Sequence, residues 1–518
     1  KDNNGKILPD FNPVSVELKD VEQTVRVPIV NGVEYTDNLR YEYQQNQSKK
    51  DNIRDGSDNK QQGNNSDNQN GSPLSGTYPT LTEALNDLST RGVSGAVRLI
   101  LMDASYSTNE TFPLTLGSVN NSSLTNSVTI LPGPSVTATI TNGTTQGILS
   151  LVGSDYVTID GSNSGGTDRS LTIENTYSSA TLVTWGFGLF NNGTDLATNC
   201  TLKNTNIKMT GAVATNPEYG IFLNYASGNS CPNTVITNNK VYKTRYVMQF
   251  TGYAGSITTN GEISKNIFGD ATEPVTYRGI MLSYADNTLI SENEIFGNPA
   301  GNTNTYQTGI NISTASTNTK IRKNRIHDFY YTGTTGYSNY GINYNSDAST
   351  VTEISNNEIY NINADGDQNS YSNGQYIPSG IRIVTGGNIQ IYYNSIFMNG
   401  ATLGRGSYDG ISSCITIEAS ITLLDIRNNA LQNSNTDYPG STSSNITYTV
   451  FSMSDKNAFT NSNYNDYYFN GVDPNLGYIN SADVATLAGW KSGTTGTGQD
   501  GYSVSGNPAF KLTSPNYL

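Results

Sequence analysis

One compact cluster of basic side chains stands out as a source of chemistry. It consists of Lys320, Arg322, Lys323, Arg325 and His327. Removing a proton next to a uronate carboxylate requires a lysine or arginine base, with calcium or other cations to neutralise the acid. The near-alternation of the cluster is also typical of the solvated outer face of a strand. We favour that structural role and assign catalysis to none of these residues.

Paired carboxylates are the second feature with chemical meaning, because glycoside hydrolysis uses two of them about 5–10 Å apart. Glu292 or Glu294 can approach Glu262 or Arg322 if adjacent segments pair as strands ~4.8 Å apart. Glu353 and Glu358 can likewise face the segment 322–325. Charge compensation between neighbouring strands is the interpretation that we favour, and glycoside hydrolysis is the alternative.

One loop has the oxygen-rich spacing of a calcium site. Asp365, Asp367 and Asn369 stand at alternate positions, as ligands do in calcium loops. Ser370 stands where such loops have glycine, and a distant bidentate glutamate is not evident. The sequence requires no cofactor; calcium is the metal that this loop can hold, and an ordinary polar loop is the alternative.

Tyrosines gather in and beside two long loops, 330–340 and 364–379. Each combines an apolar ring face, on which a sugar ring can stack, with a polar tip. Packing of the rings against their own coil explains the pattern equally well. The candidate glycan-binding residues are Tyr330, Tyr331, Tyr337, Tyr340, Tyr371 and Tyr376, with Tyr344 beside them.

The three cysteines, Cys200, Cys231 and Cys414, are too few for a disulfide scaffold, and their odd number leaves one unpaired. Cys200 and Cys231 lie 31 residues apart, which is about one coil of the repeat described next. A bridge between neighbouring coils and two buried small side chains both remain open.

The elements that position these residues are short strands in a repeat. Its first string is an apolar residue, two residues, Asn, one residue and an apolar residue, spaced by 27 to 37 residues. The asparagines are Asn239, Asn266 (in a shortened copy), Asn293, Asn324, Asn357, Asn394 and Asn429. We expect them to stack at a turn, in the left-handed conformation, with each amide bonding the next.

A second string, Gly-Ile followed by alternating apolar residues, precedes most copies of the first. It occurs at Gly220, Gly279, Gly309, Gly341, Gly380 and Gly410. No segment between residues 200 and 450 shows the 3.6-residue apolar period of a helix. Strands coiled into parallel ladders are the remaining solution, so we predict an all-β fold, a right-handed parallel β-helix of roughly ten coils.

A solenoid needs caps at its open ends. We predict one capping helix near residues 80–89, with Leu81, Leu85 and Leu88 buried and a strand over 96–102 after it. A second is predicted near 481–490, beginning at Ser481, with Leu487 and Trp490 over the last coil. The predicted organisation is an N-terminal extension of strands and polar linker, 1–75, followed by the β-helix with its caps, 76–518.

Charge and hydropathy limit the partners. The net charge of −14 disfavours nucleic acid. No apolar run reaches the ~18–20 residues of a membrane helix. The first residues lack the apolar core of a signal peptide, so we expect an already processed chain.

Four segments carry a resemblance to a known group: 78–85, 91–95, 155–162 and 499–510, together with the Asn-bearing coils between them. The chain resembles pectin-lyase-like β-helix proteins on the surface of Bacteroidetes-type bacteria, many of them exported by the type IX secretion route. The resemblance covers about residues 76 to 515. It implies the β-helix fold and a secreted or cell-surface location, but carries over no catalytic motif. The C-terminal sorting domain usual in the group is absent, which implies removal or a position beyond this sequence.

The function that we predict is a non-catalytic surface protein, an adhesin or filament component, that binds glycans or other surface subunits. A single histidine and no clear nucleophile–base pair favour it. The alternative is a polysaccharide lyase or glycoside hydrolase of the same fold. The β-rich stretches 14–18 and 25–30 should pair with an exposed sheet edge, either on the same molecule or on an adjacent one, which predicts self-association through residues 1–75.

Overall fold

The structure is a computed structural model. It describes residues 29–30, 33–34 and 77–510, except 194, 212–216, 224–227, 229, 302, 304–305, 347–349, 367–373 and 407. The chain divides into two compact units, Lys1–Lys60 and Gln61–Leu518. In the first unit, β1 (Ile29–Val30) pairs antiparallel with β2 (Val33–Glu34). The predicted strand over 14–18 lies outside the described residues.

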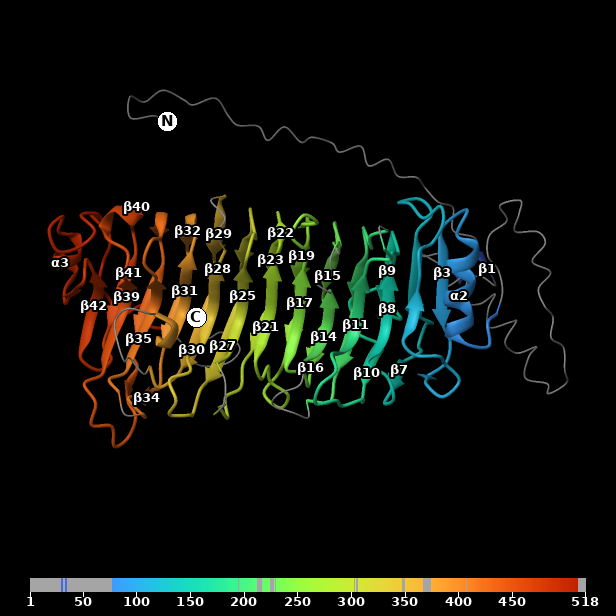
Figure 1. Cartoon of the computed structure of the whole chain (residues 1–518), viewed down its shortest axis with the longest axis horizontal. Coiled ribbons are helices and arrows are strands. Elements are labelled where there is room, and N and C mark those ends of the chain that lie inside the picture. The colour runs from blue at the N-terminus through green and yellow to red at the C-terminus, as the bar shows by residue number, and fades with distance from the viewer. Residues whose placement is uncertain are drawn as a thin grey trace, which may run out of the picture. The chain divides into compact units, whose positions relative to one another are not determined.

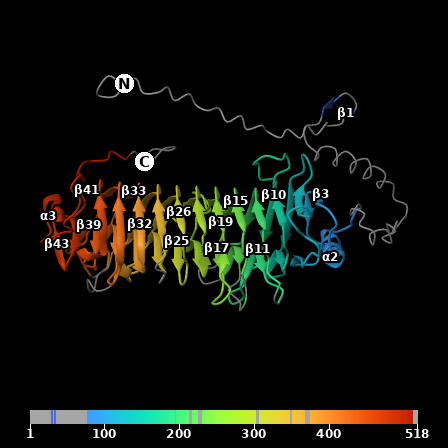
Figure 2. The ribbon, with the colours of Figure 1, turned by 90° about the horizontal axis from the view of Figure 1, so that it is seen from above.

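The second unit is a right-handed parallel β-helix, which confirms the predicted fold class (Figure 1). Each complete coil visits three sheets in turn. The front sheet has 13 strands and faces the viewer in Figure 1, and the second and third sheets have 12 strands each. Figure 2 shows the same stacking of coils from above.

The strands of the three sheets are short and in parallel register, except for the last pair of the front sheet. The front sheet contains β5 (Leu114–Leu116), β8 (Gly147–Val152), β11 (Thr184–Phe190), β14 (Glu218–Leu223), β17 (Tyr246–Thr251), β21 (Arg278–Ser283), β25 (Thr308–Ser313), β28 (Tyr340–Asn345), β31 (Ser379–Thr385), β35 (Ile411–Ile417), β39 (Ile446–Ser452), β42 (Pro474–Ile479) and β43 (Ala482–Val484). The second sheet contains β3 (Val97–Leu101), β6 (Val128–Pro132), β9 (Val157–Asp160), β12 (Thr201–Lys203), β15 (Val235–Thr237), β19 (Glu262–Ser264), β23 (Leu289–Ser291), β26 (Lys320–Arg322), β29 (Thr352–Ser355), β32 (Gly387–Tyr392), β36 (Thr422–Arg427) and β40 (Phe459–Asn463). The third sheet contains β4 (Ser105–Tyr106), β7 (Ala138–Asn142), β10 (Leu171–Asn175), β13 (Thr205–Lys208), β16 (Lys240–Tyr242), β20 (Ile267–Phe268), β24 (Glu294–Phe296), β27 (Arg325–Tyr330), β30 (Glu358–Asn363), β33 (Ser395–Met398), β37 (Ala430–Asn433) and β41 (Asp466–Phe469). Two small pairs, β18 (Thr258–Thr259) with β22 (Ala285–Asp286) and β34 (Ala401–Leu403) with β38 (Thr436–Asp437), lie at corners, as do the 3₁₀ turns η2 (Gly374–Tyr376) and η3 (Lys456–Ala458).

The corner between the second and third sheets, here the ladder corner, is a two-residue turn from residue 204 onward. Its second residue is the recurrent asparagine, and all seven predicted asparagines stack there, each Nδ2 donating to the Oδ1 of the next at 2.9–3.0 Å. The same oxygen accepts the preceding asparagine's backbone N–H, as Asn324 Oδ1 does from Asn293 at 3.1 Å. Every amide group in this asparagine ladder is therefore used in a buried position.

The expected left-handed conformation belongs to a different residue. The residue before each ladder asparagine has the positive φ, 53° at Asn238 and 56° at Lys265 for example, whereas the ladder asparagines do not. One left-handed residue turns the chain sharply enough for a two-residue corner. The asparagine after it stays extended, so that its amide aligns with its neighbours.

The ladder continues one coil further than the sequence pattern. Asn429 donates to Asn465 Oδ1 at 3.0 Å. The pattern missed Asn465 because Ser462 occupies the apolar position three residues before it. A second, more exposed row of asparagines with the same spacings stands just before the second-sheet strands, where Asn233, Asn260 and Asn287 donate to their neighbours at 2.8–3.0 Å.

The Gly-Ile string and the asparagine string form one packing unit. A Cβ on Gly309 would lie 2.4 Å from Ile326 Cγ2 and 2.6 Å from the carbonyl oxygen of Gly341. Ile326 is the apolar residue two positions after the ladder Asn324. The front-sheet glycine therefore leaves room for the third-sheet isoleucine to fill the core.

The last Gly-Ile string lies at the start of a front-sheet strand, as predicted, but it is out of register with the other strings. Ile381 pairs with Ile415, and the structural equivalent of Gly380 is Cys414. Ile411 instead packs outside the main core, in a small cluster with Tyr448. The two Gly-Ile positions look alike in sequence, but the loop before β35 shifts the strand by several residues.

Both ends are capped. As predicted, α2 (Leu81–Arg91) buries Leu81, Ala84, Leu85 and Leu88, and Thr80 caps its first turn. The predicted helix over 481–490 is wrong in its first half, because β43 pairs antiparallel with β42 and closes that sheet edge. α3 (Leu487–Lys491) follows with Thr486 as N-cap; Trp490 is fully buried and Leu487 half-buried.

Within the described ranges, no helix is long and apolar enough to cross a membrane.

Candidate functional site: an aromatic ridge on the front sheet

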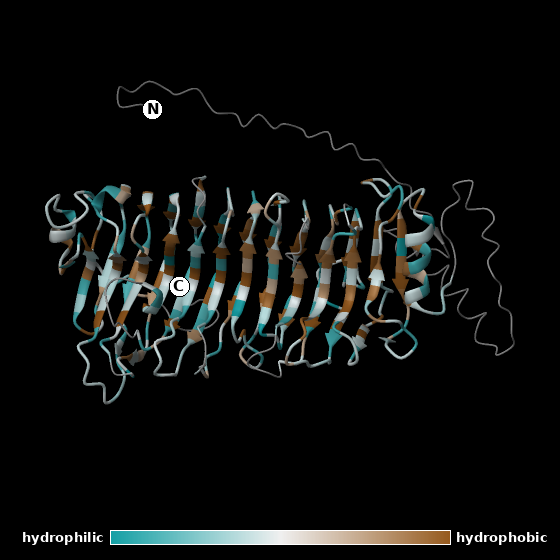
Figure 3. Ribbon diagram, viewed as in Figure 1, coloured by the Kyte–Doolittle hydropathy of each residue, from teal (hydrophilic) through white to brown (hydrophobic). Residues whose placement is uncertain are grey.

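The outward side chains of the front sheet are unusually aromatic over its first half. The register aligns Trp185 with Tyr219 and Tyr219 with Tyr246. Two residues further along the same strands, Phe187 and Ile221 are fully buried in the core. Figure 3 shows hydrophobic and hydrophilic bands along the front strands.

These aromatic rings touch one another from coil to coil. Tyr219 stacks on Phe222 at 4.6 Å and on Tyr246 at 4.8 Å between ring centroids. Tyr246 meets Tyr277 edge to face at 4.9 Å, and Tyr277 lies 5.7 Å from Tyr306. We call this row the aromatic ridge, and its members are Trp185, Phe190, Tyr219, Phe222, Tyr246, Tyr277, Tyr306 and Tyr337.

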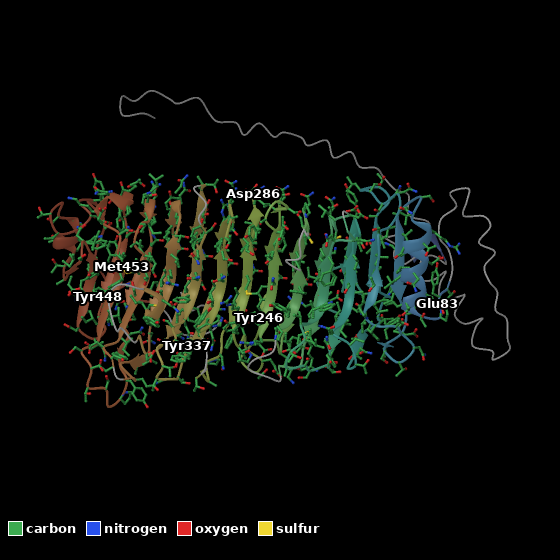
Figure 4. The ribbon with its side chains drawn as sticks, in the orientation of Figure 1. Glu83, Tyr246, Asp286, Tyr337, Tyr448 and Met453 are labelled. Carbon is green, nitrogen blue, oxygen red and sulfur yellow. The ribbon has the colours of Figure 1, made fainter. Side chains whose placement is uncertain are left out.

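The position of the ridge puts it beside the long loops. Tyr277 directly precedes β21 and Tyr306 lies two residues before Thr308, the first residue of β25, at the corner between the third and front sheets, here the loop corner. Figure 4 shows Tyr246 and Tyr337 on the lower part of the same face. Most ridge residues are half-buried, while Tyr337 is 39% exposed at the loop-corner end.

Two arginines lie against the ring faces of the ridge. Arg245 lies 4.7 Å from the ring centroid of Tyr277, and Arg278 lies 5.3 Å from that of Tyr306. Arg278 also donates to the Tyr306 hydroxyl at 2.5 Å. Burial raises the pKa of Tyr306, so the hydroxyl is neutral at pH 7 and acts as acceptor for the guanidinium.

A polar network continues the face beyond the ridge. Arg382 donates to Glu418 Oε1 from Nε at 3.0 Å and from Nη2 at 2.6 Å. Its third nitrogen donates to Asn343 Oδ1 at 3.2 Å, and its guanidinium lies 5.1 Å from the ring centroid of Tyr340. Glu418 also accepts the N–H of Gly374 at 3.2 Å, which ties the 3₁₀ turn η2 to the sheet.

The structure separates the predicted glycan-binding tyrosines. Tyr337 belongs to the ridge, and Tyr340 lies at its end, buried beneath Gln375, whose carbonyl accepts its hydroxyl. Tyr331 is fully buried and hydrogen-bonded to Thr335 at 2.7 Å.

Three other tyrosines of that prediction take no part in the ridge. Tyr330 is half-buried on the third sheet, Tyr344 is buried in the core, and Tyr376 is half-buried in η2. Tyr371 lies outside the described residues. Grouping these tyrosines by their closeness in sequence did not identify a common surface, because tyrosines of these coils lie both in the loops and in the core.

The predicted charge compensation between coils is observed. Arg322 pairs with Glu353, and Arg325 pairs with Glu294 at 3.2 Å and with Glu358 at 3.6 Å. Glu294 thus reaches Arg325 rather than Arg322. Since β24, β27 and β30 align Glu294, Arg325 and Glu358 in one column, Arg325 meets one carboxylate on the coil before it and another on the coil after it.

The calcium prediction is tested only at one residue. Asp365 is buried at the loop corner, whereas Asp367 and Asn369 lie outside the described residues. No group of three or more His, Cys, Asp or Glu side chains suited to a metal ion occurs in the part of the chain that the structure describes. Calcium in this loop stays a prediction.

The three cysteines are unbridged and buried. A disulfide between Cys200 and Cys231 is therefore not formed, and the alternative of two buried small side chains holds. Burial raises the pKa of Cys200 to about 12, so its thiol is neutral.

Most of the ridge was missed from the sequence, although a signal exists. Tyr219, Tyr277, Tyr306 and Tyr340 each precede an in-register Gly-Ile string by one to three residues. An aromatic residue at that offset lies at the start of a front-sheet strand or just before it, beside the loop corner.

No protein-family model matches the chain, and no curated protein matches it. Among solved structures, the chain is similar to the Dettilon tailspike protein, with a TM-score of 0.40 and 15% identity over 85% of this chain and 67% of that chain. It is similar to the catalytic domain of Agl-KA, with a TM-score of 0.39 and 13% identity over 84% and 67%. It is also similar to the A-module of the mannuronan C-5 epimerase AlgE6 of Azotobacter vinelandii, with a TM-score of 0.35 and 12% identity over 85% and 99%.

Proposed function

We propose that this protein is an extracellular glycan-binding β-helix protein that holds a polysaccharide along the aromatic ridge. The observation that supports this is the continuous row of contacting rings across successive coils, most of them partly exposed, although Tyr219 and Phe222 within it are buried. A polysaccharide is itself a linear repeat, and a sugar ring can stack on each ring face or edge without a deep cleft. The proposed setting is the cell surface, where the protein serves as an adhesin.

Cleavage of the bound glycan is the second candidate function. The Arg382–Glu418 pair favours it, since the pair puts a carboxylate and a cation on the same face as the ridge. Lyases and glycosidases both need such groups within reach of the bound chain. The tight pairing of Glu418 with Arg382 argues for a structural role, and binding without cleavage is therefore our first choice.

The test is a glycan array run beside a reducing-end release assay on the same polysaccharides. Tyr277→Ala should weaken binding about five- to tenfold, because an aromatic contact contributes about 1 kcal/mol. Tyr253→Ala is the matched control, since Tyr253 is 37% exposed but makes no ridge contact. Unchanged binding in Tyr277→Ala would refute the ridge as the site.

The release assay separates the two functions. Binding without new reducing ends supports the adhesin. New reducing ends that disappear in Glu418→Gln, while binding persists, would establish cleavage instead. Self-association through residues 1–75 is tested separately, by sedimentation of the full chain against a chain lacking those residues.

A further inference from the structure

A row of exposed tyrosines occupies the ladder corner at the C-terminal end of the β-helix, away from the aromatic ridge. Tyr393, Asn428 and Tyr464 take the same corner position in three successive coils, as the pairing of β32, β36 and β40 requires. Tyr502 continues the row, with its ring 5.3 Å from that of Tyr464 and only 4° from parallel. Tyr393 is 58%, Tyr464 54% and Tyr502 73% exposed.

The backbone conformation makes tyrosine a costly choice here. Tyr393 and Tyr464 have φ of 55° and 58°, in the left-handed region that asparagine tolerates and bulky side chains disfavour. The same corner position carries Asn238, Asn356 and Asn428 in three other coils, and Lys265, Glu292 and Lys323 in three more. Strain retained for a side chain that buries little of its surface points to a role in binding rather than in folding.

The Tyr464–Tyr502 pair is held rigidly from below. Asn463 Oδ1 accepts the backbone N–H of Tyr464 at 3.0 Å and that of Tyr502 at 2.9 Å. Lys491 Nζ donates to the carbonyl of Ser503 at 2.9 Å, which fixes the chain on the other side of Tyr502. The two rings are thus presented in a fixed parallel arrangement, so a ligand would not have to order them.

The surroundings of the row are polar, and their cations are already engaged. Next to it, Arg427 donates to both carboxylate oxygens of Asp425, at 2.6 and 2.9 Å, and to the Tyr392 hydroxyl at 3.0 Å. Beside Tyr502, Lys491 Nζ donates to the carbonyl oxygens of Gly501 and Ser503 at 3.3 and 2.9 Å. Flat rings flanked by hydrogen-bonding groups, with the nearby guanidinium neutralised by a carboxylate, match a neutral sugar better than an anionic chain or an apolar peptide.

We propose that Tyr393, Tyr464 and Tyr502 form a second glycan-binding site, specific for neutral polysaccharides and independent of the aromatic ridge. Sugar rings stack on the tyrosine faces along the ladder corner, and Asn428 and the Arg427 cluster bond the hydroxyl groups. The site does not depend on the function proposed for the ridge, because the two surfaces share no residue and stand at different corners of the coil.

The test is affinity electrophoresis of the full chain in native gels that contain hydroxyethyl cellulose, soluble starch, xylan or galactomannan, with polygalacturonate as the charged comparison. The variant is Tyr464→Asn with Tyr502→Ala, since asparagine is the residue that other coils use at this corner. We expect at least one neutral polysaccharide to retard the wild type, and the variant to bind it at least tenfold more weakly. The Tyr253→Ala variant should bind the neutral polysaccharide like the wild type. The Tyr277→Ala variant, which changes the aromatic ridge, should leave the affinity of the corner tyrosines for that polysaccharide unchanged.

A second measurement separates binding from packing. Tyr464→Asn alone should keep or raise the thermal midpoint, because it relieves the left-handed tyrosine. Equal retardation of wild type and double variant in every neutral gel would overturn the proposal. So would a lowered midpoint in Tyr464→Asn, retardation by polygalacturonate alone, or a sedimentation change showing that the row instead contacts a second copy of the chain.

Discussion

Replacing Asn324 by alanine, in the middle of the asparagine ladder, should destabilise the ladder corner locally. The effect should be larger at Asn293, one coil before the change, than at Asn357, one coil after it. Asn324 Oδ1 accepts the backbone N–H of Asn293 at 3.1 Å and its Nδ2 at 2.9 Å. Asn324 Nδ2 donates to the carbonyl of Ile290 at 2.9 Å and to Asn357 Oδ1 at 3.0 Å. Alanine removes all four bonds at a buried site.

The magnitude follows from the groups left behind. Two donors of Asn293 lose their acceptor, and each buried polar group without a partner costs about 1–3 kcal/mol. Water entering the space left by the amide recovers part of this cost. We expect the free energy of local unfolding to fall by about 3 kcal/mol in the two coils that contain Asn293 and Asn324. The loss stays local because a solenoid unfolds by neighbouring repeats rather than all at once.

Amide hydrogen exchange measures this directly. The Asn293 amide should exchange faster by about a hundredfold in Asn324→Ala, since 1.4 kcal/mol is a factor of ten. The Asn357 amide should change much less, because its acceptor, Asn394 Oδ1 at 3.0 Å, is intact. Asn260→Gly, in the exposed asparagine row where φ is 55°, is the control and should leave both amides nearly unchanged.

The directional argument has a clear failure. If Asn324→Ala accelerates the Asn293 and Asn357 amides equally, the ladder acts as a general packing element rather than as a chain of oriented hydrogen bonds. If neither amide changes, water has replaced the side chain at no cost, and the ladder does not stabilise the corner.

Three further predictions concern packing, thiols and pH. Gly309→Ala should lower the thermal midpoint through an overpacking cost of about 1–3 kcal/mol, whereas Gly95→Ala, where a Cβ meets nothing within 4 Å, should not; equal midpoints would contradict the glycine–isoleucine packing unit. A thiol reagent should find no reactive cysteine in the native protein and three after denaturation without reductant, and a single thiol would reveal a Cys200–Cys231 bridge. Burial lowers the pKa of His327, but hydrogen bonds to Asp328 and Glu294 outweigh it and hold the pKa above the usual value. The stability lost in His327→Gln should therefore contain a pH-dependent part that is full below about pH 6.5 and disappears as pH rises through the folded-state pKa, in addition to a constant loss of the His327–Tyr360 ring stack. Thermal unfolding from pH 5 to 9 measures it, and a pH-independent difference would contradict it.

The sequence predicts the coils in which the ladder corner requires the same residue type each time. From Asn239 onward, every coil buries a two-residue turn with one amide that must bond its neighbours, so the residue type recurs at the coil spacing. Earlier coils place Ala138 and Leu171 at the register of Thr205, where the ladder begins. Their corners are longer loops, residues 133–137 and 161–170, which do not require the same residue type in each coil, so no repeat is visible in the sequence there.

The C-terminal cap shows the opposite case. Residues 482–490 have helical apolar spacing, yet the open edge of β42 takes Ala482–Val484 as an antiparallel strand. Hydrogen bonds to the exposed backbone groups of β42 stabilise the chain more than one additional turn of helix would, because helix propensity is a weak preference. A local pattern cannot reveal this, because the edge is formed by residues elsewhere in the chain.

The residues of each candidate binding surface are far apart in the sequence, so a search for residues that cluster in the sequence does not find them. In a β-helix, the neighbours of a side chain are about one coil away, so a surface is a column with one residue from each period of 27 to 37 residues. Tyr331 and Tyr337 are close in sequence, but Tyr331 is buried and only Tyr337 joins a surface row. The aromatic ridge and the corner tyrosines are both such columns. In the ridge, aromatic rings stand where polar outer residues would suffice, and at the corner, tyrosine stands at a left-handed position that other coils fill with Asn, Lys or Glu. Because an exposed ring at such a position gains little for folding and, at the corner, costs stability, a recurring exposed ring along a structurally constant column marks a candidate binding surface on this fold.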